Sequence, residues 1–328
     1  MHESVAVRDG APKGPDTIPI SVNGRWIDAP VVRVNGQDLV INGKRIKIAR
    51  LHDEDWVENE VTDPEACIRA CKEQSGAARA DIFCFSQKVP DVNPRYRYPM
   101  ETRSMAVAHV ADYKTWLKTI SESSRKNIKR ATRDGVVVKV RGFDPDVIQG
   151  ICDVQNETPV RQGRPFRHYG KSYEQVRRDH GAFLDRCDFL CAYYEDEFIG
   201  FIKLVYRGGV ASILQILSKT SHYDKRTTNA LLAKAAERCA EKGVPYLTYD
   251  RFNYGNKGDN SLREFKERHG FAEMLLPCYY VPLTLWGRFC VATRLYRGLH
   301  GFLPHGVITA AVNLRAKWYE RTRRKREA

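Results

Sequence analysis

The feature that most constrains the fold of this chain is the order of strand and helix patterns between residues 188 and 283. The runs "DFLCAYYEDEFIGFIKLVYRGG" and "VASILQILS" predict strands separated by turns at Glu-Asp-Glu and Gly-Gly. A helical pattern, "TTNALLAKAAERCAEKG", then ends in Gly243 and precedes the strand "PYLTYDRF", the short helix "NSLREFKERHG" and the strand "FAEMLLPCYYVPL". This order predicts a mixed α/β sheet.

The sequence before this region predicts further strands and helices. Three Asn-Gly pairs, at positions 23, 35 and 42, are typical of tight hairpins. Asp63 and Pro64 predict the first turn of a helix in "DPEACIRACKEQ". The run "DYKTWLKTISESSRKNIKRATRDGVVVKV" predicts one helix leading into a strand, and "DPDVIQGICDVQNET" and "SYEQVRRDHGAFLDR" predict two more helices.

With 328 residues, the chain is long enough for two domains with cores of their own. We expect a flexible tail at 1–17, an N-terminal β-rich α+β domain at 18–110, a main α/β domain at 111–285 and a basic, aromatic C-terminal segment at 286–328. The nine cysteines form no CxxC pair, which argues against a disulfide framework and against a metal site, and favours a reducing cytoplasm. We expect Cys67, Cys71, Cys187 and Cys191 to be small buried side chains.

The charge balance points to polyanionic partners. Lys and Arg number 54 against 40 Asp and Glu, which leaves a net charge of +14. The predicted helix at 113–133 has a basic outer face, which is either a solvated helix face or an anion-binding surface. The segment from Thr284 mixes basic and aromatic residues and is interrupted by Pro304, so it suits an interfacial position on an anionic membrane, at its inner face, better than a spanning helix. The alternative is a helix packed on the protein with a frayed basic end.

The stretch "KTSHYDKRTT" leads from a predicted strand into a predicted helix. The free N–H groups and positive end of such a helix could bind a phosphate, and Lys225 and Arg226 would strengthen that site.

The order of elements, together with "ASILQILS", the helix from Thr228, "YLTYDRF" and the closing "HGF", resembles the GNAT superfamily of acyl-CoA N-acyltransferases. The stretch "SSRKNIKRATRDGVVVKV" and the Phe265-Lys266 pair resemble its Fem-like branch, which builds tandem GNAT-type domains and aminoacylates cell-wall precursors. The resemblance covers roughly residues 105–285, and residues 18–110 could be a degenerate first GNAT-like half. It implies a GNAT-type fold and acyl-CoA or acetyl-CoA as the co-substrate. In the Fem-like alternative the donor is aminoacyl-tRNA, with a cell-wall or lipid-linked acceptor.

The resemblance also implies where the donor would lie. In the GNAT fold the strand before the phosphate-binding helix offers N–H groups to the acyl carbonyl, a place that Gln215 to Ser218 occupy here. The full set expected to bind the donor is Gln215, Leu217, Ser218, Lys225, Arg226, Thr228, Asn229 and Asn256. The chain departs from the family in two ways: the loop "SHYDKRTTN" has no glycine, and Lys266 stands where a tyrosine acid would be expected.

Acyl transfer to an amine requires a base, fixed donors for the oxyanion and, for some leaving groups, an acid. Glu157 is the expected base, with Asp250 a weaker alternative. Tyr254 is the second candidate catalytic residue, and Tyr249, a phenol on the preceding strand, is equally suited to the core. Glu157 could instead pair with Arg161 or Arg164, and loop histidines such as His168 and His222 are more often structural than basic catalysts.

The stretch "NETPVRQGRPFRHYGKS", residues 156–172, is irregular and cationic. In a GNAT-type fold it would form the lid over the acceptor. The residues expected to recognise that acceptor are Arg161, Gln162, Arg164, His168 and Tyr169. Three functions follow as alternatives: an acyl-CoA-dependent N-acyltransferase acting on an amine, an aminoacyl-tRNA-dependent transferase, and a non-catalytic module that binds membrane or nucleic acid.

Overall fold

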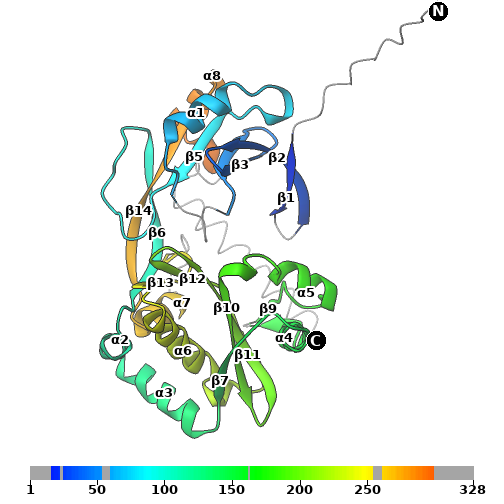
Figure 1. Ribbon diagram of the computed structural model, residues 1–328, viewed down its shortest axis with the longest axis vertical. Helices are drawn as coiled ribbons and strands as arrows, with labels where there is room; N and C mark the ends of the chain where they lie inside the picture. Colours follow the sequence, from blue (N-terminus) through cyan, green and yellow to red (C-terminus); the bar gives the residue numbers. More distant parts are fainter. Residues whose placement is uncertain (1–15, 23–24, 54–59, 162, 254–260, 299–328) are drawn as a thin grey trace, which may run out of the picture.

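The computed structural model describes residues 16–22, 25–53, 60–161, 163–253 and 261–298 (Figure 1). The predicted mixed α/β architecture is confirmed. Its centre is a sheet of twelve strands in the order β1-β2-β3-β4-β5-β14-β6-β13-β12-β11-β10-β7, and a separate pair, β8-β9, lies outside it. The elements of the first and last parts of the chain therefore belong to one continuous sheet.

The N-terminal part of the sheet is formed by hairpins and one crossover. Its strands are β1 (Thr17–Val22), β2 (Arg25–Val34), β3 (Gln37–Asn42), β4 (Ile48–Leu51) and β5 (Ile82–Ser86). The turn between β2 and β3 is the predicted Asn-Gly hairpin, because Asn35 and Gly36 both adopt positive φ. β4 and β5 pair in parallel and are connected through α1 (Pro64–Lys72) and the short helix η1 (Gly76–Ala78).

Two long strands join the halves of the sheet. β6 (Met100–His109) and β14 (Ala272–Pro282) pair antiparallel, and they are far apart in the sequence. β14 also pairs with β5, and β6 also pairs with β13.

The C-terminal part of the sheet contains β7 (Val137–Arg141), β10 (Cys187–Tyr194), β11 (Glu197–Arg207), β12 (Val210–Ser218) and β13 (Tyr246–Thr248). The first four pair antiparallel, whereas β12 and β13 pair in parallel across the helix α6 (Thr227–Glu241). The helices that precede this crossover are α2 (Tyr113–Thr119), α3 (Glu122–Arg133), α4 (Pro145–Asn156) and α5 (Tyr173–His180). The shorter elements are β8 (Val160–Arg161), β9 (Arg164–Pro165), η2 (Leu184–Arg186) and η3 (Tyr223–Lys225); after β13 come α7 (Ser261–Arg268), α8 (Leu285–Ala292) and η4 (Leu295–Arg297).

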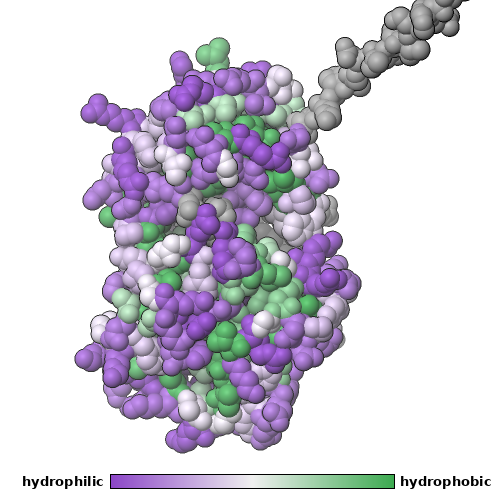
Figure 2. Space-filling model, in the orientation of Figure 1, coloured by the Kyte–Doolittle hydropathy of each residue, from purple (hydrophilic) through white to green (hydrophobic). Residues whose placement is uncertain are grey.

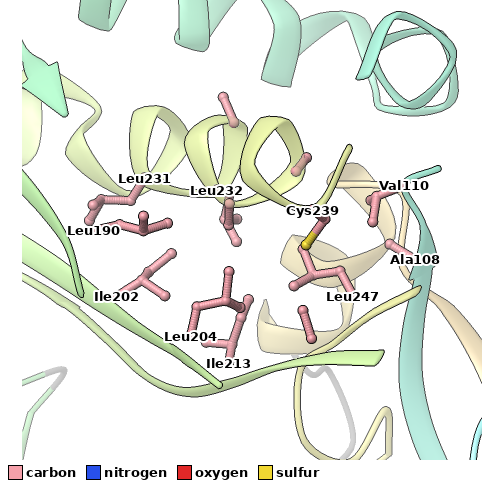
Figure 3. Packing of buried hydrophobic residues seen from close by; sticks show 14 of the residues in the cluster. Ala108, Val110, Leu190, Ile202, Leu204, Ile213, Leu231, Leu232, Cys239 and Leu247 are labelled. Carbon is pink, nitrogen blue, oxygen red and sulfur yellow. The ribbon is translucent and has the colours of Figure 1, made fainter. Parts of the chain in front are cut away.

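Helices cover both faces of the C-terminal part of the sheet. Leu231, Leu232 and Cys239 of α6 pack against Leu190, Ile202 and Leu204 on one face (Figure 3). Val147, Ile151 and Val154 of α4 pack against Phe189, Cys191 and Phe201 on the other face. Neighbouring strand residues such as Phe189 and Leu190 thus enter different cores, as the alternation of side chains along a strand requires.

Two predicted helices differ from the structure. The single helix expected at 113–133 is two helices, because Ile120 is extended and the Ser121 hydroxyl accepts from the Ser124 N–H to cap α3. The helix expected to continue through "GAFLDR" ends at His180, because Gly181 follows it and Phe183 adopts positive φ.

Other expectations can be compared directly with the structure. Asp63 caps α1 by accepting from the Ala66 N–H at 2.9 Å, as predicted. Cys67, Cys71 and Cys191 are buried, whereas Cys187 is half-buried. None of the helices in the described ranges combines the length and the hydropathy that a membrane-spanning segment needs. The predicted tail at 1–17 falls almost wholly outside the described residues.

Candidate active site

The candidate site lies where the parallel strands β12 and β13 separate. They pair only over Val210–Ser212 and Tyr246–Thr248. Beyond this point β12 continues along β11 to Ser218, whereas Tyr249 and Asp250 form backbone hydrogen bonds with Ala106 of β6. In the part of the chain that the structure describes, the edge of β12 after Ser212 therefore has no partner strand on the side that faced β13.

A β-bulge lies on this unpaired length of β12. The register with β11 shifts between Lys203 and Leu204, so that Leu214 is the extra residue. A bulge leaves its residue outside the ladder and redirects the neighbouring backbone groups. The backbone of β12 can thus offer N–H groups to a ligand at the point where the two strands separate.

Glu157 binds the loop that follows β12. One carboxylate oxygen accepts from the Thr220 N–H at 2.7 Å and hydroxyl at 2.9 Å, and the other accepts from the Ser221 N–H and hydroxyl, both at 2.8 Å. Burial opposes ionisation, but the hydrogen bonds from Ser221 and Thr220 outweigh it and hold the pKa of Glu157 below its usual value. The carboxylate is an internal anion bound by the loop.

Arg161 completes this network. Its guanidinium donates to Glu157 at 3.1 Å, to the Ser218 carbonyl at 2.8 Å and to the Val154 carbonyl at 3.0 Å, and it lies over the ring of Phe166 at 4.7 Å. Both partners of the Glu157–Arg161 pair are largely buried, with 15% and 14% of their side chains exposed. The pair therefore fixes the end of β12 to the end of α4.

The amino end of α6 faces the end of β12. Arg226 precedes the helix with φ 57°, and no side chain caps it. The Thr228 hydroxyl lies 3.2 Å from the Ser218 hydroxyl. The hydroxyl of Thr227, whose side chain is buried, and Nε of Arg226 have no hydrogen-bond partner among the described residues. The first turn of α6 thus retains unused donors beside the separation of the strands.

A buried histidine connects α6 to the end of α7. His269 Nδ1 lies 2.7 Å from the Phe265 carbonyl, and Nε2 lies 2.9 Å from the Asn229 side-chain amide. Burial lowers the pKa of His269 below its usual value. Both neighbours are oxygen acceptors, the Phe265 carbonyl and Oδ1 of Asn229, so a neutral ring donates to only one of them, as its tautomer decides.

Lys266 anchors the chain after β13. Its ammonium donates to the Arg251 carbonyl at 2.5 Å and lies 4.6 Å from the ring centroid of Tyr249. Burial lowers the pKa of Lys266 to about 8. Burial also raises the pKa of the Tyr249 phenol to about 12, which makes Tyr249 a poor acid–base group near neutral pH.

The structure brings some of the predicted site residues together and separates others. Glu157, Arg161, Ser218 and Thr228 are linked by the contacts above, whereas the Asn229 side chain contacts His269. Gln215 and Leu217 lie on the same unpaired length of β12. Tyr254, Asn256 and Gln162 lie outside the described residues, so their predicted roles remain predictions.

The remaining residues point to other neighbours. Lys225 lies over the ring of Tyr194 at 4.1 Å. His168 lies between Arg167 and Lys171 at 3.1 and 3.2 Å, and burial, followed by these two cations, lowers its pKa to about 4. Arg164 and Tyr169 are exposed on the stretch that contains β8 and β9. Their role in acceptor recognition remains a prediction.

The basic outer face of α3 is only partly ion-paired. Lys126 pairs with Glu122, and Arg130 and Arg133 both pair with Asp134. This arrangement is typical of a solvated helix face.

Several residues of the site carry no recognisable signal in the sequence. Thr220 and Ser221 are ordinary loop residues, and Thr227 stands beside a second threonine. Only the "HGF" that ends the α7 pattern marked the position of His269. Across the described ranges, no group of three or more His, Cys, Asp or Glu side chains could hold a metal ion.

Comparison with known proteins identifies the fold. No family model matches the sequence, and no curated protein matches it. Among solved structures, FemX is similar with a TM-score of 0.57 at 10% identity, over 80% of this chain and 87% of that chain. The C-terminal domain of a putative lysylphosphatidylglycerol synthetase from Agrobacterium fabrum is similar with a TM-score of 0.53 at 13% identity, over 81% and 89%. L-PGS from Bacillus licheniformis is similar with a TM-score of 0.50 at 15% identity, over 81% and 88%. The fold is GNAT-like and of the Fem-like type, as the sequence resemblance predicted.

Proposed function

We propose that this protein is an acyltransferase that uses aminoacyl-tRNA as its donor and transfers the aminoacyl group to an amine. The observation that carries the choice of donor is that the loop between β12 and α6 binds the carboxylate of Glu157, which follows α4. This loop is where an acyl-CoA-dependent enzyme of the same fold would bind the pyrophosphate of its donor.

The occupied loop disfavours coenzyme A. The N–H groups of Thr220 and Ser221 already bind the Glu157 carboxylate. Those of Lys225 and Arg226 donate to carbonyls of the same loop. A pyrophosphate would have to displace a partly buried, ion-paired carboxylate and would meet its negative charge. A donor that is held through a polynucleotide needs no such loop.

The geometry of β12 supports acyl transfer. An ester carbonyl placed against the unpaired edge after Ser212 would receive backbone N–H donors, which stabilise the oxyanion that forms on attack. The amine attacks the carbonyl carbon, and the tetrahedral intermediate collapses with release of the ribose hydroxyl of the tRNA. The proton lost by the amine is balanced by the proton gained by that hydroxyl.

In this proposal Glu157, Arg161 and Lys266 are positioning residues. Glu157 and Arg161 fix the end of β12, and Lys266 fixes the chain after β13, so that the two strands stay apart. The surplus of +14 suits a tRNA ligand. Of the similar structures, the Agrobacterium fabrum protein is named for the synthesis of lysylphosphatidylglycerol, which is an aminoacylated lipid.

A second candidate donor is acyl-CoA, for which the first turn of α6 is the favourable observation. The uncapped helix end and the Arg226 side chain are groups that bind phosphate. A phosphate bound there would contact the helix without entering the loop that Glu157 occupies.

Donor binding separates the two candidates. We expect the full chain to retard aminoacylated tRNA in a native gel and to protect its ester from hydrolysis, with little protection of an acetylated nucleoside. Calorimetric titration with acetyl-CoA and a long-chain acyl-CoA should give no saturable heat. Saturable binding of acyl-CoA together with an absence of ester protection would overturn the proposal in favour of the second candidate.

A further inference from the structure

The helix α8 presents an apolar face that the described part of the protein does not cover. Leu285, Trp286 and Phe289 are 82%, 44% and 53% exposed. The rings of Trp286 and Phe289 stack with their centroids 5.5 Å apart. Figure 2 shows a hydrophobic projection at the end of the molecule where α8 lies, surrounded by hydrophilic side chains. Three large apolar side chains side by side mark an interaction surface.

The opposite face of α8 is fixed to the protein, so the exposed face cannot turn inward. Gly287 and Cys290 are buried, and a Cβ at Gly287 would lie 1.9 Å from the Asp81 carbonyl oxygen. Thr284 caps the helix through the Gly287 N–H and also donates to Asp81 at 3.0 Å. The orientation of the apolar face is thus set by the tertiary structure.

Basic side chains border the apolar face. Trp286 Nε1 donates to the Arg45 carbonyl at 3.1 Å, which places the turn containing Lys44 and Arg45 beside it. Lys44, Arg45, Arg288 and Arg294 are exposed, and none of them pairs with a carboxylate among the residues that the structure describes. The nearby acids are engaged: Asp81 accepts from Lys47 and Thr284, and Glu101 pairs with Arg297.

We propose that α8 and the Lys44–Arg45 turn form a docking surface for an anionic lipid bilayer. Leucine and aromatic side chains would enter the boundary between headgroups and acyl chains, and the surrounding cations would contact lipid phosphates. A nucleic acid would use the cations but would leave Leu285 and Phe289 exposed to water. A second copy of the chain would place the same cations against one another. The combination of charge and apolar face therefore fits a membrane better than a nucleic acid or a second copy of the chain.

The test is sedimentation of the full chain with vesicles, without donor or acceptor, so it is independent of the proposed transferase activity. We expect binding to vesicles of phosphatidylglycerol and phosphatidylethanolamine, and little binding to phosphatidylcholine vesicles. The double variant Leu285→Ser/Phe289→Ser should lower the partition coefficient at least about tenfold. The control Val137→Thr/Val140→Thr removes exposed apolar surface from β7 and should leave it unchanged.

Charge is tested with a matched pair of triple variants. Lys44→Gln/Arg45→Gln/Arg288→Gln should weaken binding to anionic vesicles at least about tenfold at low salt. Lys114→Gln/Lys118→Gln/Lys129→Gln removes the same charge from α2 and α3, which lie at the other end of the molecule (Figure 1), and should have a much smaller effect. Equal losses in the two triple variants, or undiminished binding of Leu285→Ser/Phe289→Ser, would overturn the proposal. A dimer that is lost in that double variant while vesicle binding stays unchanged would also overturn the proposal, in favour of a second copy of the chain.

Discussion

Within the described residues, the sheet contains two parallel strand pairs. Each pair is connected through a helix, and the two pairs differ in the side chains that lie beside them. β4 and β5 are joined by α1, and β12 and β13 are joined by α6. In the first pair, the Asp63 carboxylate caps the amino end of the helix. In the second, the helix begins at Thr227, after Arg226, without a side-chain cap. The amino end of the connecting helix is thus capped by a side chain in the β4–β5 pair and uncapped in the β12–β13 pair.

The strands beyond the paired residues differ in the same way. β5 runs past β4, and there Phe85 packs against Tyr96, Tyr98 and Tyr279 with ring centroids 5.0–6.2 Å apart. β12 runs past β13 without an equivalent aromatic cluster among the described residues, and its end is held by Glu157 and Arg161. Topology alone therefore does not make a site. The candidate site depends on the uncapped end of α6 and on the unpaired edge of β12.

The largest effect is expected from placing a negative charge at the uncapped amino end of α6. Thr228→Asp places a carboxylate in the first turn of α6, where it favours the helix but repels a phosphate-bearing donor. Donor binding or transfer should fall about a hundredfold while the melting temperature stays within about 2 °C. Ser123→Asp puts the same charge in the first turn of α3 and serves as the control. Unchanged activity in Thr228→Asp would show that the open end of α6 does not contact the donor.

The next effect tests whether Glu157 holds the second pair together or acts as the predicted base. Glu157→Gln removes an ion pair and weakens the bonds to Thr220 and Ser221, so we expect a loss of about 2–3 kcal/mol in the free energy of unfolding. Chemical denaturation measures this loss of stability. The control is Glu174→Gln, which breaks an exposed pair with Arg177 and should cost less than about 0.5 kcal/mol. A hundredfold loss of turnover at unchanged stability and donor affinity would instead identify Glu157 as the base.

We expect a fall in pH to destabilise the region around α4 and α5. Burial lowers the pKa of His180 to about 3 and that of His168 to about 4, and both residues belong to the elements around α4 and α5. The unfolded chain binds protons on these rings below about pH 6.5, before the folded chain does. The stability that they contribute is therefore present above pH 6.5 and is lost as the pH falls toward 4.

Hydrogen exchange between pH 7 and pH 5, corrected for intrinsic rates, measures this change. Protection of α4 and α5 should fall, whereas protection of α1 and β5 should not. His180→Gln should reduce the pH dependence. A uniform loss of protection across both halves would contradict the assignment.

The smallest effect is expected from removing the side-chain cap of α1. Asp63→Ala removes the cap of α1 and should cost about 1 kcal/mol, seen in denaturant unfolding. Donor binding should not change, because aromatic side chains fill the space beside β5. Glu73→Ala at the other end of the same helix is the control. A gain or loss of donor binding in Asp63→Ala would show that the first pair also takes part in the site.

Much of the fold could be predicted because its signals are local. Asp63 and Pro64 define the start of α1, the Asn35-Gly36 turn sets a hairpin, and Gly243 ends the helix α6 with positive φ. The break at Ser121 was missed because the apolar pattern of α2 and α3 continues across it. A serine within a helical pattern can cap a new helix or simply face solvent, and only the neighbouring backbone decides which.

The candidate site was predictable in its location but not in its contacts. The sequence identified the helix start near Thr228 and singled out Glu157 and Arg161. It could not show that Glu157 binds Thr220 and Ser221, which are 63 and 64 residues away. It could not show either that Leu285 and Phe289 face outward, since helical spacing gives the same stripe to a buried helix and to an exposed one.

By itself, the sequence determined the order of strands and helices, the excess of positive charge and the resemblance to a fold, because these depend on local propensities and composition. Only the tertiary structure decided that aromatic side chains pack beside the β4–β5 pair and that the edge of β12 stays unpaired beyond the β12–β13 pair. That difference depends on side chains that meet from distant parts of the chain: Tyr279 with Phe85 in one half, and Glu157 with the loop after β12 in the other. Contacts of this kind arise from packing in three dimensions, and no local pattern in the sequence encodes them.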